Sequence, residues 1–249
     1  MGVSNNTAPE ARRRGERGTS AARSPRAPRS AIPGQVGRRA ASNRQSHGFL
    51  REVLEHYAGG SLTGIDEQAL RAQWLWLETD ESVLGSADVG TELVLVESGL
   101  LAESLVGQHP GTLDFVERGQ FGGNVLAMLG DARQSDPVCD AGLEPAVSYS
   151  YRAVAPSRVV LLDAERIGWL ASRDPSWAEV RRRMTICSIQ ASQVRERERL
   201  TRSPDQRYVD LVDRRPDVAA QLTQREIARF LGVSEVTMSR MKSRVSGRG

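Results

Sequence analysis

The sequence has few of the residues from which metal and redox centres are built. Its 249 residues include only two cysteines and three histidines. Cys139 and Cys187 lie far apart and form no CxxC pair, which argues against a disulfide framework and against a structural zinc site. An iron–sulfur cluster would need about four thiolates. We therefore expect no cofactor and no metal.

Long hydrophobic runs are also missing. In the expected core, the longest stretch without a charge is Gly119–Gly130, which is rich in glycine. A membrane helix needs roughly 20 apolar residues, so we expect no membrane partner. The basic N-terminus is not followed by the apolar segment of a secretory signal, and the expected location is the cytosol.

Lysine is nearly absent, since Lys242 is the only one among 34 basic residues. The net charge of +3 conceals an uneven distribution. Residues 1–45 hold ten arginines against Glu10 and Glu16, a net charge of +8, and residues 222–249 carry +4. Residues 46–221 carry −9. Two basic ends around an acidic middle indicate a partner of negative charge that meets the ends of the chain.

The composition of the sequence and the spacing of its apolar residues change several times along the chain. Residues 1–45 are too polar to form a core, and we expect a disordered basic arm. Helical spacing of apolar residues predicts a helix from about Ser46 to Gly59-Gly60 and a second, short one over 66–77. Short apolar runs separated by turn residues then predict an antiparallel barrel or sandwich. These strands are expected at 92–96, 100–106, 112–116, 147–154 and 158–162.

From Pro175 the apolar residues repeat every three or four positions, as in a coiled coil. This pattern predicts a helix of roughly 25 residues whose narrow apolar seam packs against a second copy of the chain. The alternative is that the seam packs on the chain's own barrel. The seam consists of Trp177, Val180, Met184, Cys187, Ala191 and Val194.

The stretch Leu222–Val245 has the features of a helix-turn-helix. Thr223 and Glu226 have the spacing of a capping box, and Gly232 can adopt the left-handed turn. Ser234 is a good N-cap for a second helix, on which Met238, Met241 and Val245 would face inward. A helical hairpin that merely packs is the alternative.

The outer face of the second helix would then read DNA in the major groove. Arg240 is the candidate for guanine readout, Glu235 for a cytosine amino group and Val236 for a thymine methyl. Ser239, Ser243, Thr237 and Ser234 add hydroxyl groups. Thr223, Arg225, Lys242 and Arg244 are the expected phosphate contacts.

A strand-rich domain, a long helix and a helix-turn-helix follow one another in this order in the cyclic AMP receptor protein and fumarate–nitrate regulator (Crp/Fnr) family. The chain resembles that family over roughly residues 60–245. The motifs that carry the resemblance are LVESG at Leu95–Gly99, RGQFGGNVLAMLG at Arg118–Gly130, RAVAPSRVVLLD at Arg152–Asp163 and the run from Arg195 to Val245.

The resemblance implies an α+β fold with an N-terminal antiparallel β-roll, a long dimerisation helix and a C-terminal helix-turn-helix. The corresponding domains are an arm at 1–45, a sensor-like β-roll at 46–170, the dimerisation helix at 171–203 and the DNA-binding domain at 204–249. Family members are homodimers that bind palindromic double-stranded DNA and recruit or block RNA polymerase. We therefore expect a homodimeric, sequence-specific transcription regulator.

The expected effector pocket departs from the family pattern. Cyclic-nucleotide binders of this family carry Gly-Glu in the phosphate cassette, whereas this chain has Gly123-Asn124. The family's Arg-Ser, which neutralises the cyclic phosphate, corresponds to Arg133-Gln134-Ser135 or to Val147-Ser148. The negative charge of a buried phosphate is poorly compensated without that arginine, so we expect no dependence on cyclic AMP.

A different class of function is a β-roll small-molecule receptor or enzyme that carries an accessory DNA-binding tail. A jelly-roll metalloenzyme would need several histidines on its strands, and the strand region offers only His109. No Ser-His-Asp or Cys-His pairing is evident, so we expect no enzymatic activity.

Overall fold

The computed structural model describes residues 37–65, 70–83, 91–105, 111–133 and 149–246. All of them belong to one compact unit, Pro33–Gly249. Most of the predicted arm, His109, Cys139, and the segment Gln134–Ser148 lie outside the described residues. Residues 38–39 and 44–45, which the sequence assigned to the arm, form a short strand and the start of a helix.

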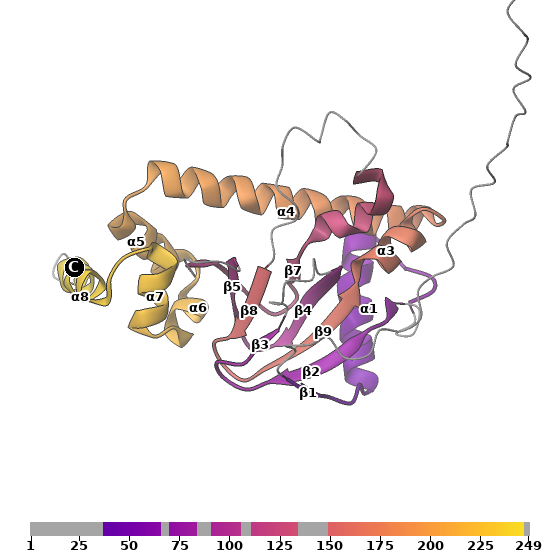
Figure 1. Cartoon of the computed structure of the whole chain (residues 1–249), viewed down its shortest axis with the longest axis horizontal. Helices are drawn as coiled ribbons and strands as arrows, with labels where there is room; N and C mark the ends of the chain where they lie inside the picture. Colours follow the sequence, from indigo (N-terminus) through magenta and orange to yellow (C-terminus); the bar gives the residue numbers. More distant parts are fainter. Residues whose placement is uncertain (1–36, 66–69, 84–90, 106–110, 134–148, 247–249) are drawn as a thin grey trace, which may run out of the picture. The chain divides into compact units, whose positions relative to one another are not determined.

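The strands form two antiparallel sheets (Figure 1). The first sheet has the order β1-β2-β9-β4-β7, and the second has the order β3-β8-β5-β6. Their bounds are β1 Arg38–Arg39, β2 Gln73–Leu77, β3 Ser82–Val83, β4 Glu92–Ser98, β5 Leu101–Leu105, β6 Thr112–Val116, β7 Phe121–Gly123, β8 Tyr149–Ala153 and β9 Ser157–Asp163. The predicted strands in this part of the chain are confirmed. The inner faces of the two sheets share a buried cluster that includes Leu77, Val94 and Leu161.

The helices α1 Arg44–Ala58 and α4 Pro175–Thr201 are confirmed close to their predicted bounds. Gly59 ends α1 in the left-handed conformation, with φ 74°, as the Gly59-Gly60 pair indicated. The sequence did not predict the 3₁₀ helix η1 Val125–Arg133 or α3 Ala164–Ala171. Gly168 on α3 lies so close to η1 that an added Cβ would stand 2.1 Å from the carbonyl oxygen of Met128.

The helix predicted over 66–77 is wrong for residues 73–77, while residues 66–69 lie outside the described residues. Residues 73–77 form β2, which pairs with β9 from Gln73 opposite Leu161 to Leu77 opposite Ser157. The apolar positions Leu70, Trp74 and Leu77 fit a helical period, but aromatic residues also favour strands. Pairing with β9, which is distant in sequence, decided the outcome.

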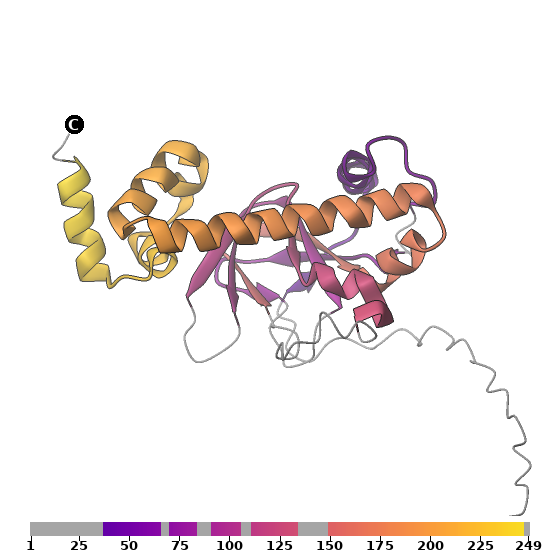
Figure 2. The same ribbon diagram turned by 90° about the horizontal axis from the view of Figure 1, so that it is seen from above.

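The long helix α4 runs past the β-roll (Figure 2). Its first half is packed against α1, α3 and the first sheet, because Trp177, Val180 and Met184 belong to the same buried cluster as Leu50 and Leu93. Beyond α4 the chain forms α5 Pro204–Arg214, α6 Pro216–Gln221, α7 Gln224–Leu231 and α8 Glu235–Ser246. No helix among the described residues is long and apolar enough to cross a membrane.

Candidate nucleic-acid interface and sensor pocket

The helices α7 and α8 have the local geometry that the sequence predicted for a helix-turn-helix. Thr223 and Glu226 form a reciprocal capping box: Thr223 Oγ1 accepts a hydrogen bond from Glu226 N, and Glu226 Oε2 accepts one from Thr223 N. Gly232 has a φ of 71°, a conformation that favours glycine, and it turns the chain between the two helices. Ser234 Oγ accepts a hydrogen bond from Thr237 N at the start of α8.

The inner faces of α7 and α8 are buried in one hydrophobic cluster. Met238 and Met241 of α8 pack there with Ile227, Ala228 and Leu231 of α7. The side chain of Val245, the third predicted inward residue, lies outside the described side chains. The small Ala228 lets the second helix approach closely, so the hairpin is rigidly packed.

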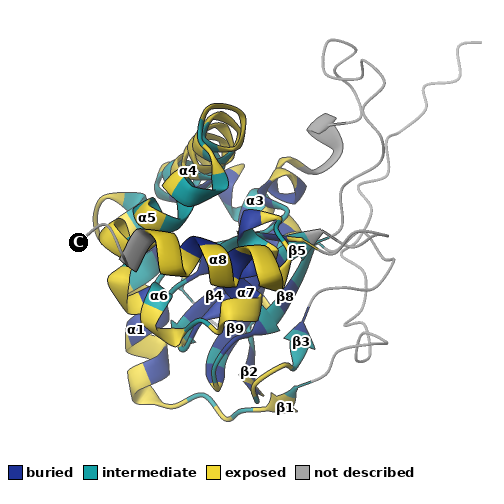
Figure 3. Ribbon diagram, turned by 90° about the vertical axis from the view of Figure 1, so that its left-hand side faces the viewer, coloured by how far each residue is buried: buried dark blue, intermediate teal, exposed yellow. Residues whose placement is uncertain are grey.

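The outer face of α8 is exposed along its length, as the yellow residues in Figure 3 show. It carries the predicted DNA contacts Glu235, Val236, Thr237, Ser239, Arg240, Lys242, Ser243 and Arg244, all of them exposed. Val236, the apolar residue of this face, is 63% exposed.

Not all of these polar groups are equally available. Arg225 forms an ion pair with Glu235 at 3.7 Å, and Arg244 donates two hydrogen bonds to the carboxylate of Asp205 on α5. The Ser243 hydroxyl donates to the Ser239 carbonyl within the helix. Within the part of the chain that the structure describes, Arg240 and Lys242 have no ion-pair partner. Their charges are therefore the ones most readily offered to a ligand.

The dimer seam predicted on α4 is divided between two environments. Trp177, Val180 and Met184 are buried in the chain's own core, so these three residues are not available to a partner, and the prediction is wrong for them. Cys187, Ala191 and Val194 are exposed. Ile186 and Ile189, which the sequence did not single out, are 38% and 48% exposed on the same stretch of α4.

The expected effector pocket contains a buried hydrogen-bond chain that the sequence analysis also missed. Tyr151 of β8 crosses over β7, where an added Cβ at Gly122 would lie 2.4 Å from the tyrosine ring. The Tyr151 hydroxyl accepts a hydrogen bond from the backbone N–H of Gly123 and donates one of 2.8 Å to Glu103 Oε1. The amide of the predicted phosphate cassette is therefore already bonded within the protein.

Burial governs the ionisation of this pair. Desolvation raises the pKa of Glu103 above its ordinary value, although the hydrogen bond from Tyr151 and the charge of Arg195 lower it. The pKa of Tyr151 is also raised well above its usual value, first by burial and then by the nearby carboxylate of Glu103. The cassette residue Asn124 caps the turn by accepting a hydrogen bond from Leu126 N. The Arg133 side chain lies outside the described side chains.

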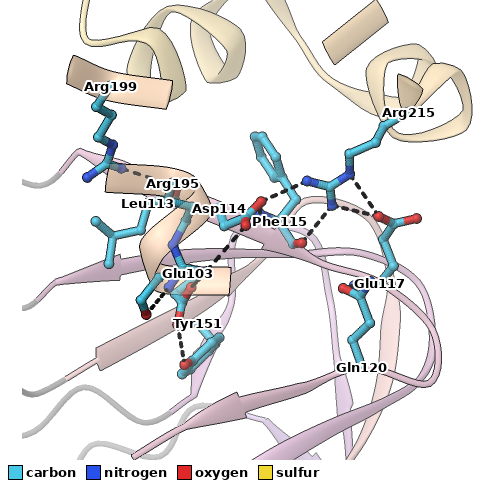
Figure 4. A network of polar contacts seen from close by, with 11 residues as sticks. Glu103, Leu113, Asp114, Phe115, Glu117, Gln120, Tyr151, Arg195, Arg199 and Arg215 are labelled. Carbon is cyan, nitrogen blue, oxygen red and sulfur yellow. Dashed lines mark hydrogen bonds and ion pairs between the residues drawn. The ribbon is translucent and has the colours of Figure 1, made fainter. Parts of the chain in front are cut away.

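Arginines of α4 and of the α5–α6 junction surround the carboxylates next to this pair (Figure 4). Arg195 Nη1 of α4 lies 4.0 Å from Glu103 Oε2 and 3.4 Å from Asp114 Oδ2. Arg215, at the start of α6, donates to Asp114 Oδ1, to Glu117 Oε1 and to the Phe115 carbonyl, all on or next to β6. Among the described residues, no group of three or more histidine, cysteine and acidic side chains could hold a metal.

Comparison with known proteins defines the fold. No protein-family model and no curated protein sequence matches the chain. A transcriptional regulator assigned to the Crp/Fnr family, from Eubacterium rectale, superimposes with a TM-score of 0.57 at 13% identity, over 76% of this chain and 85% of that one.

Two further solved structures agree. FixK2 from Bradyrhizobium japonicum gives a TM-score of 0.53 at 19% identity over 72% of this chain and 86% of its own. CLP from Xanthomonas campestris, a regulator that responds to c-di-GMP, gives 0.53 at 14% identity over 81% and 92%. The chain therefore has the fold of the Crp/Fnr family of transcription regulators.

Proposed function

We propose that this protein is a homodimeric, sequence-specific DNA-binding transcription regulator that does not depend on cyclic AMP. The observation that carries the proposal is the α7–α8 hairpin, which buries its inner face and exposes a basic outer face. A second helix held in this way can enter a major groove with its N-terminal residues toward the bases. No catalytic step is assigned to the chain. The protein would regulate transcription through contact with RNA polymerase.

Base readout is assigned to three residues of α8. Arg240 donates both guanidinium arms to a guanine, and Val236 contacts a thymine methyl. Glu235 accepts from a cytosine amino group only if its ion pair with Arg225 opens. Thr223, Arg225, Lys242 and Arg244 contact phosphates and set the register of the protein on DNA.

Dimerisation is assigned to the part of α4 from Ile186 to Val194. Exposed apolar side chains are concentrated there, and a helix that displays them to water is stabilised by covering them. The dimer surface consists of Ile186, Cys187, Ala191 and Val194, which are exposed and share one side of the helix. Two-fold symmetry of the protein then requires a palindromic site whose half-sites are about one helical turn, 10–10.5 bp, apart.

Independence from cyclic AMP is supported by the contents of the β-roll. The Gly123 amide that would bind a phosphate donates to Tyr151 instead. The carboxyl group of Glu103 accepts a hydrogen bond from the same Tyr151 hydroxyl, so an acidic side chain lies next to that position. An anionic ligand would need to displace Tyr151 and to leave the Glu103 carboxyl without its hydrogen-bond donor.

A binding-site selection from random duplexes, with and without cyclic AMP, tests the proposal. We expect enrichment of one two-fold symmetric sequence, unchanged by the nucleotide, and a dimer in analytical ultracentrifugation. Failure to enrich any sequence would contradict DNA recognition. Enrichment only in the presence of cyclic AMP would contradict its independence.

A further inference from the structure

The DNA-binding helices are joined to the β-roll by two sets of charged contacts. In the first, Arg215 Nη1 donates to Asp114 Oδ1 at 2.7 Å, while Nε and Nη2 donate to Glu117 Oε1 at 2.9 and 2.6 Å. Nη2 also donates to the Phe115 carbonyl at 2.8 Å. The planar guanidinium thus engages three acceptors on one strand and the residue after it, a geometry that a lysine cannot reproduce.

The second set joins β8 to the start of α7. Arg152 Nη2 lies 3.1 Å from Glu226 Oε1, while the other carboxylate oxygen of Glu226 completes the capping box with Thr223. One side chain therefore both caps the first helix of the helix-turn-helix and fixes it to the sheet.

Apolar packing continues between these contacts. Leu100, Ala102, Phe115 and Val154 of the β-roll region belong to the same buried cluster as the inner faces of α5, α7 and α8. The Phe115 ring lies 5.3 Å from that of Phe230, centroid to centroid. A well-packed interface of this kind resists the hinge motion that is the default between loosely connected domains.

Asp114 extends the connection to α4. One of its oxygens accepts from Arg215, and the other lies 3.4 Å from Arg195 Nη1, so a single carboxylate contacts both the helix with the proposed dimer surface and the DNA-binding unit (Figure 4). Both carboxylates raise the pKa of Arg215 above its usual value, against the effect of burial. The guanidinium of Arg215 therefore keeps its charge in the folded protein.

We propose that Arg215 is a positioning residue that fixes the recognition helix α8 relative to the dimer surface of α4, without any effector. This inference rests on the proposed function, because it concerns how a dimer engages two half-sites. When the first recognition helix is bound, a fixed geometry holds the second near its half-site and gives it a high effective concentration. A loosened unit spreads over many orientations and loses that advantage, while each helix keeps its own contacts with DNA.

The test measures the affinity of the full-length protein for two duplexes obtained by selection. One carries the full palindrome and the other carries a single half-site. Avidity makes full-site binding by the wild type 10²–10⁴ times tighter than half-site binding, in order of magnitude. We expect Arg215→Gln to lower this ratio about tenfold or more, with half-site affinity unchanged. The Arg215→Gln variant should also bind palindromes whose spacer is one base pair longer or shorter nearly as well as it binds the selected palindrome. The wild type should bind these altered palindromes more weakly.

Arg214→Gln is the matched control. Arg214 is the preceding residue, largely exposed, and its ion pair with Asp210 is long at 3.7 Å. We expect this variant to retain the wild-type ratio and spacing preference. Arg215→Lys, which keeps the charge but not the fork, should give an intermediate ratio. If Arg215→Gln does not fold by circular dichroism, Glu117→Gln removes one negative charge from the contact and should lower the ratio about threefold.

The outcomes separate the two proposals. An unchanged ratio in Arg215→Gln, or in Glu117→Gln when it is the folded variant, overturns the positioning role and leaves DNA recognition standing. Equal weakening on full and half sites also overturns it, because it indicates loss of folded protein or of direct DNA contact. If the wild type itself enriches no sequence, the proposed function fails.

Discussion

Replacing Tyr151 by phenylalanine removes one hydroxyl from the centre of the β-roll and keeps the ring. Two partners lose their hydrogen bond: the carboxylate of Glu103, which is 8% exposed, and the backbone N–H of Gly123. Each buried group left without a partner costs about 1–3 kcal/mol. We expect Tyr151→Phe to lower the free energy of unfolding by about 2–6 kcal/mol in total at pH 8. At about 2–4 °C per kcal/mol for a chain of this size, that corresponds to a fall in Tm of roughly 4–24 °C.

The loss should depend on pH, with a sign that follows from Glu103. Burial raises the pKa of this carboxyl in the folded state above the value in the unfolded chain, about 4.5. Such a group stabilises the fold less as pH rises through its folded-state pKa, because the unfolded chain releases the proton more readily. The Tyr151 hydroxyl lowers that pKa, so its removal raises it further. The Tm deficit of Tyr151→Phe should therefore be larger at pH 8 than at pH 5.

Thermal unfolding followed by circular dichroism at several pH values measures both effects. Tyr149→Phe is the matched control, since the Tyr149 hydroxyl donates no hydrogen bond to another described residue, and its Tm should change little. A Tm deficit that is equal at pH 5 and pH 8 would show that Glu103 is not the group left unpaired. A loss of unfolding free energy below about 0.5 kcal/mol would refute the assignment of the hydrogen-bond chain itself.

Three other expected outcomes concern the surface. Arg240→Ala should cost about 1–3 kcal/mol on the selected duplex and much less on random DNA, measured by fluorescence anisotropy; equal losses on both would remove Arg240 from base readout. Asp205→Asn should free Arg244 for phosphates and raise affinity for random duplexes severalfold at low salt, and no change would mean that Arg244 does not contact DNA. Val194→Glu should shift the protein from dimer to monomer in sedimentation without loss of helicity, whereas a persistent dimer would place the interface elsewhere.

The helix-turn-helix was predictable because its determinants are local. The capping box joins residues three positions apart, and Gly232 needs only its own backbone conformation. The periodicity of α4 likewise predicted its bounds. Periodicity could not say which surface covers the apolar residues: Trp177 and Met184 face the chain's own core, while Ile189 faces solvent.

The sequence by itself determined the strand-rich character of the centre, the long helix α4 and the basic outer face of α8, since each follows from spacing within one segment. Tertiary structure alone decided that residues 73–77 are a strand, because β9 supplies their hydrogen bonds from some 84 positions away. It also decided the pairing of Tyr151 with Glu103, 48 positions apart, and of Arg215 with Asp114, 101 positions apart. A charged side chain in a sequence has no partner until the fold brings one within hydrogen-bond distance, so these contacts have no local pattern that could predict them.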